Sequence, residues 1–247
     1  MRIAVAGGTG VVGSYVVDAV TAGGHDPVVL SRGRGIDLVT GAGLADALTG
    51  VEAVIDVSNQ TTTSRKKAVA FFGAATANLL DAGLRAGVRH HVALSIIGID
   101  RVGLGYYAGK LRQEELITAS PLPSSVLRAT QFHEFAGQVL QQVPGPIALV
   151  PRARVQPIAA REVAAALVAL ALGSPVGMAP ELAGPQEESL ADMARRLLRA
   201  RGSRQPVLQV RLPVTGGGAM ASGGLLPTGP GPRGVQTYEK WLADRAT

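Results

Sequence analysis

Three side chains near the middle of the chain could together donate a proton to an organic substrate. Tyr106 and Lys110 are four residues apart in a predicted helix, so they lie on the same face of it. Ser95 comes near the end of a predicted strand that should finish beside that helix. In such a group the tyrosine would donate a proton to a carbonyl oxygen that the serine also hydrogen-bonds. A neighbouring cation would lower the pKa of the tyrosine toward the working pH.

A less specific interpretation of these residues stays open. Tyr106 would then pack at the mouth of a pocket, and Lys110 would be solvated or would contact only a cofactor. The neighbouring Tyr107 has no lysine four residues further on, so we expect it to line the pocket.

The first residues of the chain are typical of a dinucleotide-binding turn. Residues 3–6 are an apolar run without polar alternation, as in a parallel strand buried on both faces, and a helical pattern covers residues 11–22. Between them lie Gly7, Gly10 and Gly13, three residues apart. Such glycines let a pyrophosphate approach the backbone at the N-terminus of the helix. The alternative is a tight turn that binds nothing.

Arginines follow the second predicted strand, at residues 27–30. Ser31 and Arg32 come about twenty residues after the glycine turn, where an acidic residue would bind the 2′-hydroxyl of an adenosine ribose. An arginine there accommodates a 2′-phosphate instead. With Arg34 close behind, the sequence favours NADP over NAD, and a solvated loop arginine is the alternative.

Two further predicted strands would bring polar groups to the same edge of the sheet. In the third strand, residues 35–38, Asp37 and Leu38 lie where a carboxylate could reach the adenine amino group. The fourth, residues 51–57, ends in Ser58, Asn59 and Gln60. Ligands of such sheets bind at the carboxyl ends of the strands, so this stretch would border the binding crevice.

Strands and helices alternate over the first part of the chain, which predicts an α/β fold with a doubly wound parallel sheet. Further helices are predicted at residues 44–48, 65–86 and 106–119, and further strands at 91–96 and 125–128. We expect a dinucleotide-binding domain over residues 1–144. A smaller substrate-binding region, residues 145–247, would be intertwined with it as one structural unit.

The pattern becomes less regular in this C-terminal region. Strands are predicted at 147–150, 181–183 and 207–210, and helices at 163–172, 189–201 and 238–243. Ser189 and Asp192 resemble a capping pair at the start of one helix, and Trp241 should anchor the last helix on the core. Residues 211–237 are rich in glycine and proline and predict a mobile lid or a loose loop.

Composition argues against several functional classes. The net charge of +6 could suggest nucleic acid, but the arginines are scattered and only four Phe, four Tyr and one Trp are available to stack on bases. The absence of cysteine excludes disulfides and suits the cytoplasm. The four histidines show no zinc spacing, so no metal is expected. No charged and apolar leader precedes the first strand, and the apolar helix at 163–172 is too short to span a bilayer.

Several segments resemble the atypical short-chain dehydrogenase/reductases, most closely the NmrA-like NAD(P)-binding proteins of actinobacterial type. They are GGTGVVG at residue 7, HVALSIIGID at residue 91, YYAGKLRQEELI at residue 106, SSVLRATQFHEF at residue 124, QPIAAREVAAALVALA at residue 156 and ELAGPQEESLADMARRL at residue 181. The resemblance covers nearly the whole chain. The chain departs from the family pattern in two ways. Ser95 and Tyr106 are only eleven positions apart, and Val57, Ser58 and Asn59 replace the usual Asn-Ala-Gly motif.

The resemblance implies roles for the residues above and adds others. Ser95, Tyr106 and Lys110 would form the catalytic triad, and Asn59 would lie near the nicotinamide ribose. Gln131 would border the nicotinamide carboxamide and the substrate. The expected cofactor contacts are Gly7, Thr9, Gly10, Val11, Val12, Gly13, Ser31, Arg32, Arg34, Asp37, Leu38, Val57, Ser58, Asn59, Lys110, Gln131 and Phe132. The expected substrate contacts are Tyr107, Phe132 and His133, with a surface-facing His133 as the alternative.

The sequence therefore predicts an NADPH-dependent reductase of a small carbonyl or quinone substrate. Because the family resembled also contains epimerases and redox-sensing regulators, a dinucleotide-dependent epimerase or isomerase and a sensor without turnover stay open. We expect a small-molecule substrate, neither nucleic acid nor membrane as a partner, and a monomer or homodimer.

Overall fold

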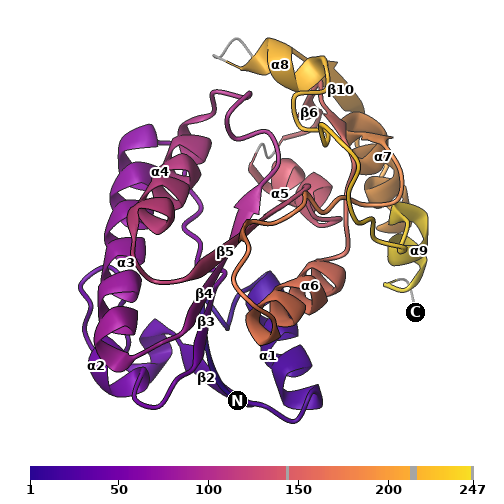
Figure 1. Cartoon of the computed structure of the whole chain (residues 1–247). Helices are drawn as coiled ribbons and strands as arrows, with labels where there is room; N and C mark the ends of the chain where they lie inside the picture. Colours follow the sequence, from indigo (N-terminus) through magenta and orange to yellow (C-terminus); the bar gives the residue numbers. More distant parts are fainter. Residues whose placement is uncertain (143–144, 212–215, 246–247) are drawn as a thin grey trace. The chain divides into compact units, whose positions relative to one another are not determined.

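The chain folds into two compact units in the computed structural model, which describes residues 1–142, 145–211 and 216–245 (Figure 1). The first unit comprises Met1–Ser95, Gly105–Arg128 and Ala160–Pro180. The second comprises Ile96–Leu104, Ala129–Ala159 and Glu181–Thr247. The chain thus passes between the units several times. The predicted end of the dinucleotide-binding domain, residue 144, lies outside the described residues.

A six-stranded parallel sheet forms the centre of the first unit, in the order β2-β1-β3-β4-β5-β8. The bounds are β1 (Arg2–Ala6), β2 (Asp26–Leu30), β3 (Ala53–Asp56), β4 (His90–Ile96), β5 (Ser124–Ala129) and β8 (Gly177–Met178). β1 has a strand on each side, and its residues from Ile3 to Ala6 are fully buried. This explains its unbroken apolar run. The doubly wound parallel α/β fold predicted from the sequence is confirmed.

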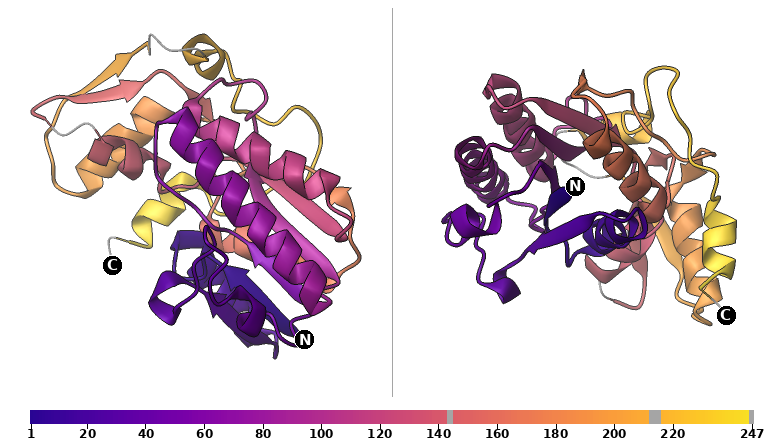
Figure 2. Two further views of the ribbon diagram at one scale, coloured as in Figure 1. Left: turned by 90° about the vertical axis from the view of Figure 1, so that its left-hand side faces the viewer. Right: turned by 60° about the horizontal axis from the view of Figure 1, so that its bottom comes forward.

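Helices cover both faces of this sheet. α1 (Val11–Ala22) packs against α6 (Ala160–Leu172) on one face, and α2 (Leu44–Ala47), α3 (Arg65–Ala86) and α4 (Gly105–Ala119) lie on the other (Figure 1). Figure 2 shows α3 and α4 running side by side across the sheet. The strand order reverses between β2 and β3, on either side of β1. In open α/β sheets, ligands bind at the carboxyl ends of the strands beside such a reversal.

The second unit is smaller and less regular. It contains α5 (Phe135–Gln142), α7 (Leu190–Ala200), α8 (Gly217–Ala221), α9 (Tyr238–Ala243), the parallel pair β6 (Ala148–Pro151) and β10 (Val207–Val210), and the antiparallel pair β7 (Arg154–Val155) and β9 (Glu188–Ser189). The ring of Trp241 stacks on Tyr238 at 5.5 Å, and the Tyr238 hydroxyl donates to the carbonyl of Met193 in α7. Trp241 is itself buried and its ring packs against His133, so it anchors the last helix, as predicted.

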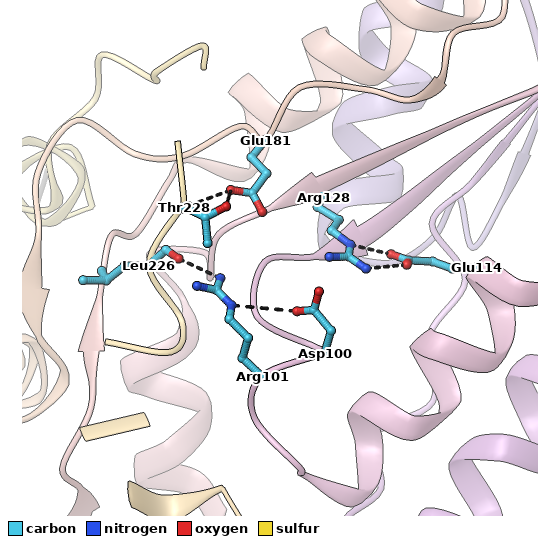
Figure 3. A network of polar contacts seen from close by, with 7 residues as sticks. All are labelled: Asp100, Arg101, Glu114, Arg128, Glu181, Leu226 and Thr228. Carbon is cyan, nitrogen blue, oxygen red and sulfur yellow. Dashed lines mark hydrogen bonds and ion pairs between the residues drawn. The ribbon is translucent and has the colours of Figure 1, made fainter. Parts of the chain in front are cut away.

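Charged side chains are paired inside each unit, as the close-up in Figure 3 shows. In the first unit Arg128 on β5 makes two hydrogen bonds to the carboxylate of Glu114 on α4, at 2.9 and 2.7 Å. In the second unit Arg101 lies 3.8 Å from the carboxylate of Asp100 and donates to the carbonyl of Leu226.

Some expected elements differ from the observed ones. Residues 35–38 form no strand. A 3₁₀ helix, η1 (Arg32–Arg34), ends at Gly35, and the Asp37 carboxylate then accepts the N–H groups of Val39 and Thr40, which turns the chain. Residues 181–183 make only isolated bridges, and the last strand of the sheet is β8.

The expected capping pair and lid also differ in detail. Ser189 precedes α7 in an extended conformation and makes no capping hydrogen bond through its side chain. Part of the predicted lid, residues 212–215, lies outside the described residues, and α8 forms within the rest of it. In the described part of the chain, no helix is both long enough and apolar enough to cross a membrane.

Candidate functional site

The turn between β1 and α1 has a shape that requires glycine at two positions. Gly7 has a φ of +80°, and a Cβ there would lie 2.8 Å from the carbonyl oxygen of Val57. A Cβ at Gly13 would lie 2.1 Å from the carbonyl oxygen of Gly7. Any side chain at either position would force the first strand, the first helix and the end of β3 apart. At Gly7 and Gly13, therefore, only the backbone, with no side chain, occupies the turn at this edge of the sheet.

The N-terminus of α1 offers backbone N–H groups to a ligand. Gly10 is its N-cap, and no side chain caps this helix. Ser64 caps α3 and Thr237 caps α9 through their side-chain oxygens, whereas the N-cap residues of α2, α7 and α8, like that of α1, make no such hydrogen bond. The first N–H groups of a helix have no acceptor within the helix, and the helix dipole adds partial positive charge there. With Thr9 and Gly10 exposed, this end of α1 suits an anion such as a pyrophosphate.

Two arginines lie after β2, at the edge of the sheet next to the glycine turn. Ser31 is the N-cap of η1, and both Arg32 and Arg34 within it are exposed. Asn78 of α3 holds the following loop by donating to the carbonyls of Leu38 and Val39, at 2.9 and 2.8 Å. The arginines thus lie where the sequence predicts contact with an adenosine phosphate.

The carboxyl end of β3 passes close to the glycine turn. The N–H of Val57 donates to the carbonyl of Ala6, and the N–H of Ser58 donates to Oδ1 of Asp56, at 3.0 and 2.9 Å. The hydroxyl of Ser58 is buried and has no hydrogen-bond partner among the described residues, whereas Asn59 is exposed. A buried hydroxyl without a partner is available to a bound ligand.

Tyr106 approaches this stretch from α4. Its hydroxyl donates to Oδ1 of Asn59 at 2.7 Å, and its ring packs edge-on against Phe72 at 5.6 Å. Burial raises the pKa of Tyr106, and the neighbouring Tyr107 raises it further. The hydroxyl therefore stays protonated at neutral pH. This direction is opposite to the one expected from the sequence, because burial and Tyr107 both favour the neutral hydroxyl.

Lys110 lies one turn further along α4, and its side chain points into the first unit. Its Nζ donates to the carbonyl oxygen of Leu94 at 2.5 Å and to Oε1 of Gln113. The residue is almost completely buried. Burial lowers the pKa of Lys110 to about 8, although the carboxylates of Asp56 and Glu114 oppose that shift.

Ser95 and Tyr107 are both buried. The hydroxyl of Ser95, next to the Leu94 carbonyl on β4, has no hydrogen-bond partner among the described residues. Among the residues that the structure describes, no hydrogen bond joins Ser95, Tyr106 and Lys110 to one another. The structure thus links Tyr106 to Asn59 and Lys110 to β4.

Sequence reasoning missed two residues that contact this group. Nε2 of Gln113 donates to Oδ2 of Asp56 at 2.8 Å, and both side chains are buried. A signal for each was present. Gln113 is three residues after Lys110, so it shares the same helix face. Asp56 is a carboxylate inside an apolar strand, where a charged group requires a partner.

Gln131, Phe132 and His133 belong to the second unit. The amide of Gln131 is buried and forms no hydrogen bond with the described residues, and Phe132 pairs with Ile158 in an isolated bridge. His133 is fully buried, and its Nε2 lies 3.0 Å from the carbonyl oxygen of Gln236. The alternative prediction that His133 faces the surface is therefore wrong, because its ring packs inside this unit against Tyr238 and Trp241.

The residues of the first unit fit a nicotinamide dinucleotide. The cradle at Gly7 and Gly13 would be filled by any side chain, and the uncapped start of α1 lies beside it. Two buried hydroxyls have no hydrogen-bond partner among the described residues. That of Ser58 follows β3, and that of Ser95 lies near the end of β4. The protonated hydroxyl of Tyr106 adds a proton donor on α4.

Comparison with known proteins supports the same fold. No family model matches the chain, and no curated protein sequence matches it. Among solved structures, the NADPH-dependent quinone oxidoreductase of Escherichia coli, complexed with NADPH, is 19% identical with a TM-score of 0.74, covering 99% of this chain and 100% of the other. A short-chain dehydrogenase/reductase superfamily protein from Agrobacterium tumefaciens with bound NAD is 20% identical with a TM-score of 0.70, covering 100% and 96%.

A third solved structure carries a different activity on the same fold. The UDP-glucose 4-epimerase of Thermus thermophilus, in complex with NAD, is 18% identical with a TM-score of 0.69, covering 100% of this chain and 94% of the other. At these identities the likeness shows the fold. The chain has a Rossmann fold like that of these solved structures, and this fold agrees with the resemblance found in the sequence.

Proposed function

We propose that this protein binds NADPH and reduces a small carbonyl or quinone substrate. The observation that carries the proposal is the glycine turn, where a Cβ at Gly13 would lie 2.1 Å from a backbone oxygen and where α1 starts without a side-chain cap. Such a turn, beside the reversal of strand order, is suited to a dinucleotide pyrophosphate. The solved structures of the same fold bind NADPH or NAD, which supports a nicotinamide cofactor.

Each part of the cofactor would have its own protein groups. Backbone N–H groups at the start of α1 would hold the pyrophosphate, and the exposed Arg32 and Arg34 would hold the 2′-phosphate. Asn59 and Lys110 would hold the nicotinamide ribose. The bound nicotinamide would supply the hydride.

Tyr106 would supply the proton. Because burial raises its pKa, Tyr106 enters the reaction protonated, as a group that donates to a developing alkoxide must be. Substrate oxygen would then take the place of Oδ1 of Asn59 as the acceptor of the Tyr106 hydroxyl. The buried hydroxyl of Ser95 would donate a second hydrogen bond to that oxygen.

An epimerase is the second candidate, because the Thermus thermophilus epimerase has the same fold. Epimerisation through oxidation and re-reduction requires a group that first removes a proton. A tyrosine with a raised pKa is already protonated at neutral pH and cannot take up a proton, so the protonated Tyr106 favours reduction. A sensor that binds the cofactor without turnover would leave Tyr106 without a catalytic role.

Two measurements test the proposal. Calorimetric titration should show NADPH binding more tightly than NADH. Arg32→Ala and Arg34→Ala should each weaken NADPH but not NADH binding, whereas Arg85→Ala, at an exposed arginine on α3, should change neither. Tyr106→Phe should abolish NADPH oxidation with a panel of quinones, ketones and aldehydes while leaving NADPH affinity intact. Tight NADPH binding without oxidation by any member of the panel would refute the reductase.

Several parts of the proposal depend on the second unit or on other copies of the chain. Tyr107, Phe132 and His133 remain the predicted substrate contacts, and residues 211–237 the predicted lid. A monomeric or dimeric state and a cytoplasmic location also stay predictions.

A further inference from the structure

Two hydrogen bonds tie α4 to the carboxyl end of β3. The hydroxyl of Tyr106 donates to Asn59, and the amide of Gln113 donates to Asp56, at 2.7 and 2.8 Å. Tyr106 and Gln113 are seven residues apart, about 10 Å along a helix axis, while Asp56 and Asn59 are three residues apart, about 10 Å in an extended chain. The two spacings match, with the helix running antiparallel to the strand. Lys110 lies on the helix between the two contacts.

Gln113 connects the lysine to the strand in a way that few side chains could. The ammonium of Lys110 can only donate hydrogen bonds, and the carboxylate of Asp56 can only accept them. The amide of Gln113 accepts from Lys110 through Oε1 and donates to Asp56 through Nε2. Because Asp56 takes the N–H₂ end of the amide, the oxygen end must face the lysine.

Asp56 also controls the chain that follows β3. Its Oδ2 accepts from Gln113, and its Oδ1 accepts from the N–H of Ser58. All three side chains of the series Asp56, Gln113 and Lys110 are buried, at 0%, 1% and 4% exposure. One carboxylate thus fixes both the amide that holds the lysine and the backbone that leads to Asn59.

We infer that Gln113 is a positioning residue, held by Asp56, that fixes the ammonium of Lys110 where it would contact the ribose of a nicotinamide cofactor. The inference rests on the proposed function for the ribose contact, but the positioning of the ammonium is a property of the protein alone. A merely structural role would stabilise the fold without changing how Lys110 titrates or how tightly the cofactor binds.

The experiment measures the protonation of Lys110 directly. The chain has only four lysines, and Lys66, Lys67 and Lys240 are exposed. In a protein labelled with ¹³C at the lysine Cε, the Lys110 resonance is assigned from its absence in Lys110→Met. Its titration is then followed in the full-length wild type and in variants of Gln113, with the three exposed lysines as internal references.

The two Gln113 variants should move the pKa of Lys110 in opposite directions. Gln113→Met removes an acceptor of the charged form, so the pKa should fall from about 8 to about 7. Gln113→Glu places a carboxylate beside the ammonium, so the pKa should rise. Glu115→Gln, at an exposed position on the same helix, is the control and should leave it unchanged. Circular dichroism checks that each variant is folded. If Gln113→Met is not folded, Asp56→Asn is used in its place. The pKa of Lys110 should also be lowered in Asp56→Asn.

Cofactor affinity separates this inference from the proposed function. NADPH should bind Gln113→Met about tenfold more weakly than wild type, as expected when one positioning hydrogen bond is lost. An unchanged pKa of Lys110 in both Gln113 variants, with normal NADPH binding, would overturn the positioning role and keep the proposed function. If the two Gln113 variants shift the pKa of Lys110 in opposite directions but the wild-type protein binds no NADPH, the positioning of Lys110 is supported and the proposed function is refuted.

Discussion

Replacing Lys110 with methionine should change how the stability of the protein depends on pH. Burial lowers the pKa of Lys110 from the ordinary value of 10.5 to about 8 in the folded protein. Between these two pH values the unfolded chain binds the proton and the folded protein does not. The free energy of unfolding therefore rises with pH across this window, and the destabilising effect of the charge is fully present below pH 8.

The size of the effect follows from the same two values. A difference of one pKa unit corresponds to about 1.4 kcal/mol, so Lys110 should add about 3 kcal/mol to the free energy of unfolding as the pH rises through the window. Lys110→Met lacks this contribution. It also leaves the Leu94 carbonyl and the Gln113 amide oxygen without a donor, a loss present across the whole window because a neutral amine still donates hydrogen bonds.

Urea unfolding at several pH values between 7 and 10.5 measures this difference. The free energy of the wild type minus that of Lys110→Met should grow by about 3 kcal/mol as the pH rises. Tyr106 and Tyr238, whose pKa values burial raises, are present in both proteins and cancel in the subtraction. Parallel curves for the two proteins over this range would refute the reasoning.

Three other substitutions test separate parts of the structure. Gly13→Ala would place a Cβ 2.1 Å from the Gly7 oxygen, so it should abolish NADPH binding and lower the melting temperature; calorimetry that still detects binding would contradict this. Arg128→Met leaves the Glu114 carboxylate largely buried without its two hydrogen bonds, and urea unfolding should show a loss of about 3 kcal/mol. Arg154→Met, at the exposed pair with Glu187, is its control and should lose much less. Trp241→Ala should destabilise the protein by about 3 kcal/mol, seen in thermal unfolding, because it removes the ring stacked on Tyr238.

Local sequence signals predicted much of the fold. α3 and α9 begin and end where the sequence places them, because a serine or threonine caps each start and the long amphipathic pattern of α3 ends at Gly87, whose φ is +75°. The same logic failed for residues 35–38. Their alternating apolar residues are typical of a strand, but the Asp37 carboxylate accepts hydrogen bonds from the N–H groups of Val39 and Thr40, which favours a turn.

The candidate site was less predictable, because its chemistry depends on contacts between residues far apart in the chain. The spacing of Tyr106 and Lys110 predicts a shared helix face, but it does not predict that Lys110 bonds to Leu94 and Gln113. The link from Gln113 to Asp56 spans 57 positions. Nor does the spacing predict the raised pKa of Tyr106, because that shift comes from burial of its hydroxyl and from the neighbouring Tyr107.

The buried polar series also argues for function on energetic grounds. Replacing a buried charged group with well-packed apolar residues of similar volume often leaves the stability of a protein unchanged or raises it. Asp56, Gln113 and Lys110 occupy buried positions, and burial, which lowers the pKa of Lys110, disfavours its charge in the folded protein. The series therefore does not serve stability alone. Asp56 ends β3, and the chain that follows it passes close to the glycine turn, so the series reaches the edge of the sheet where the cofactor would bind.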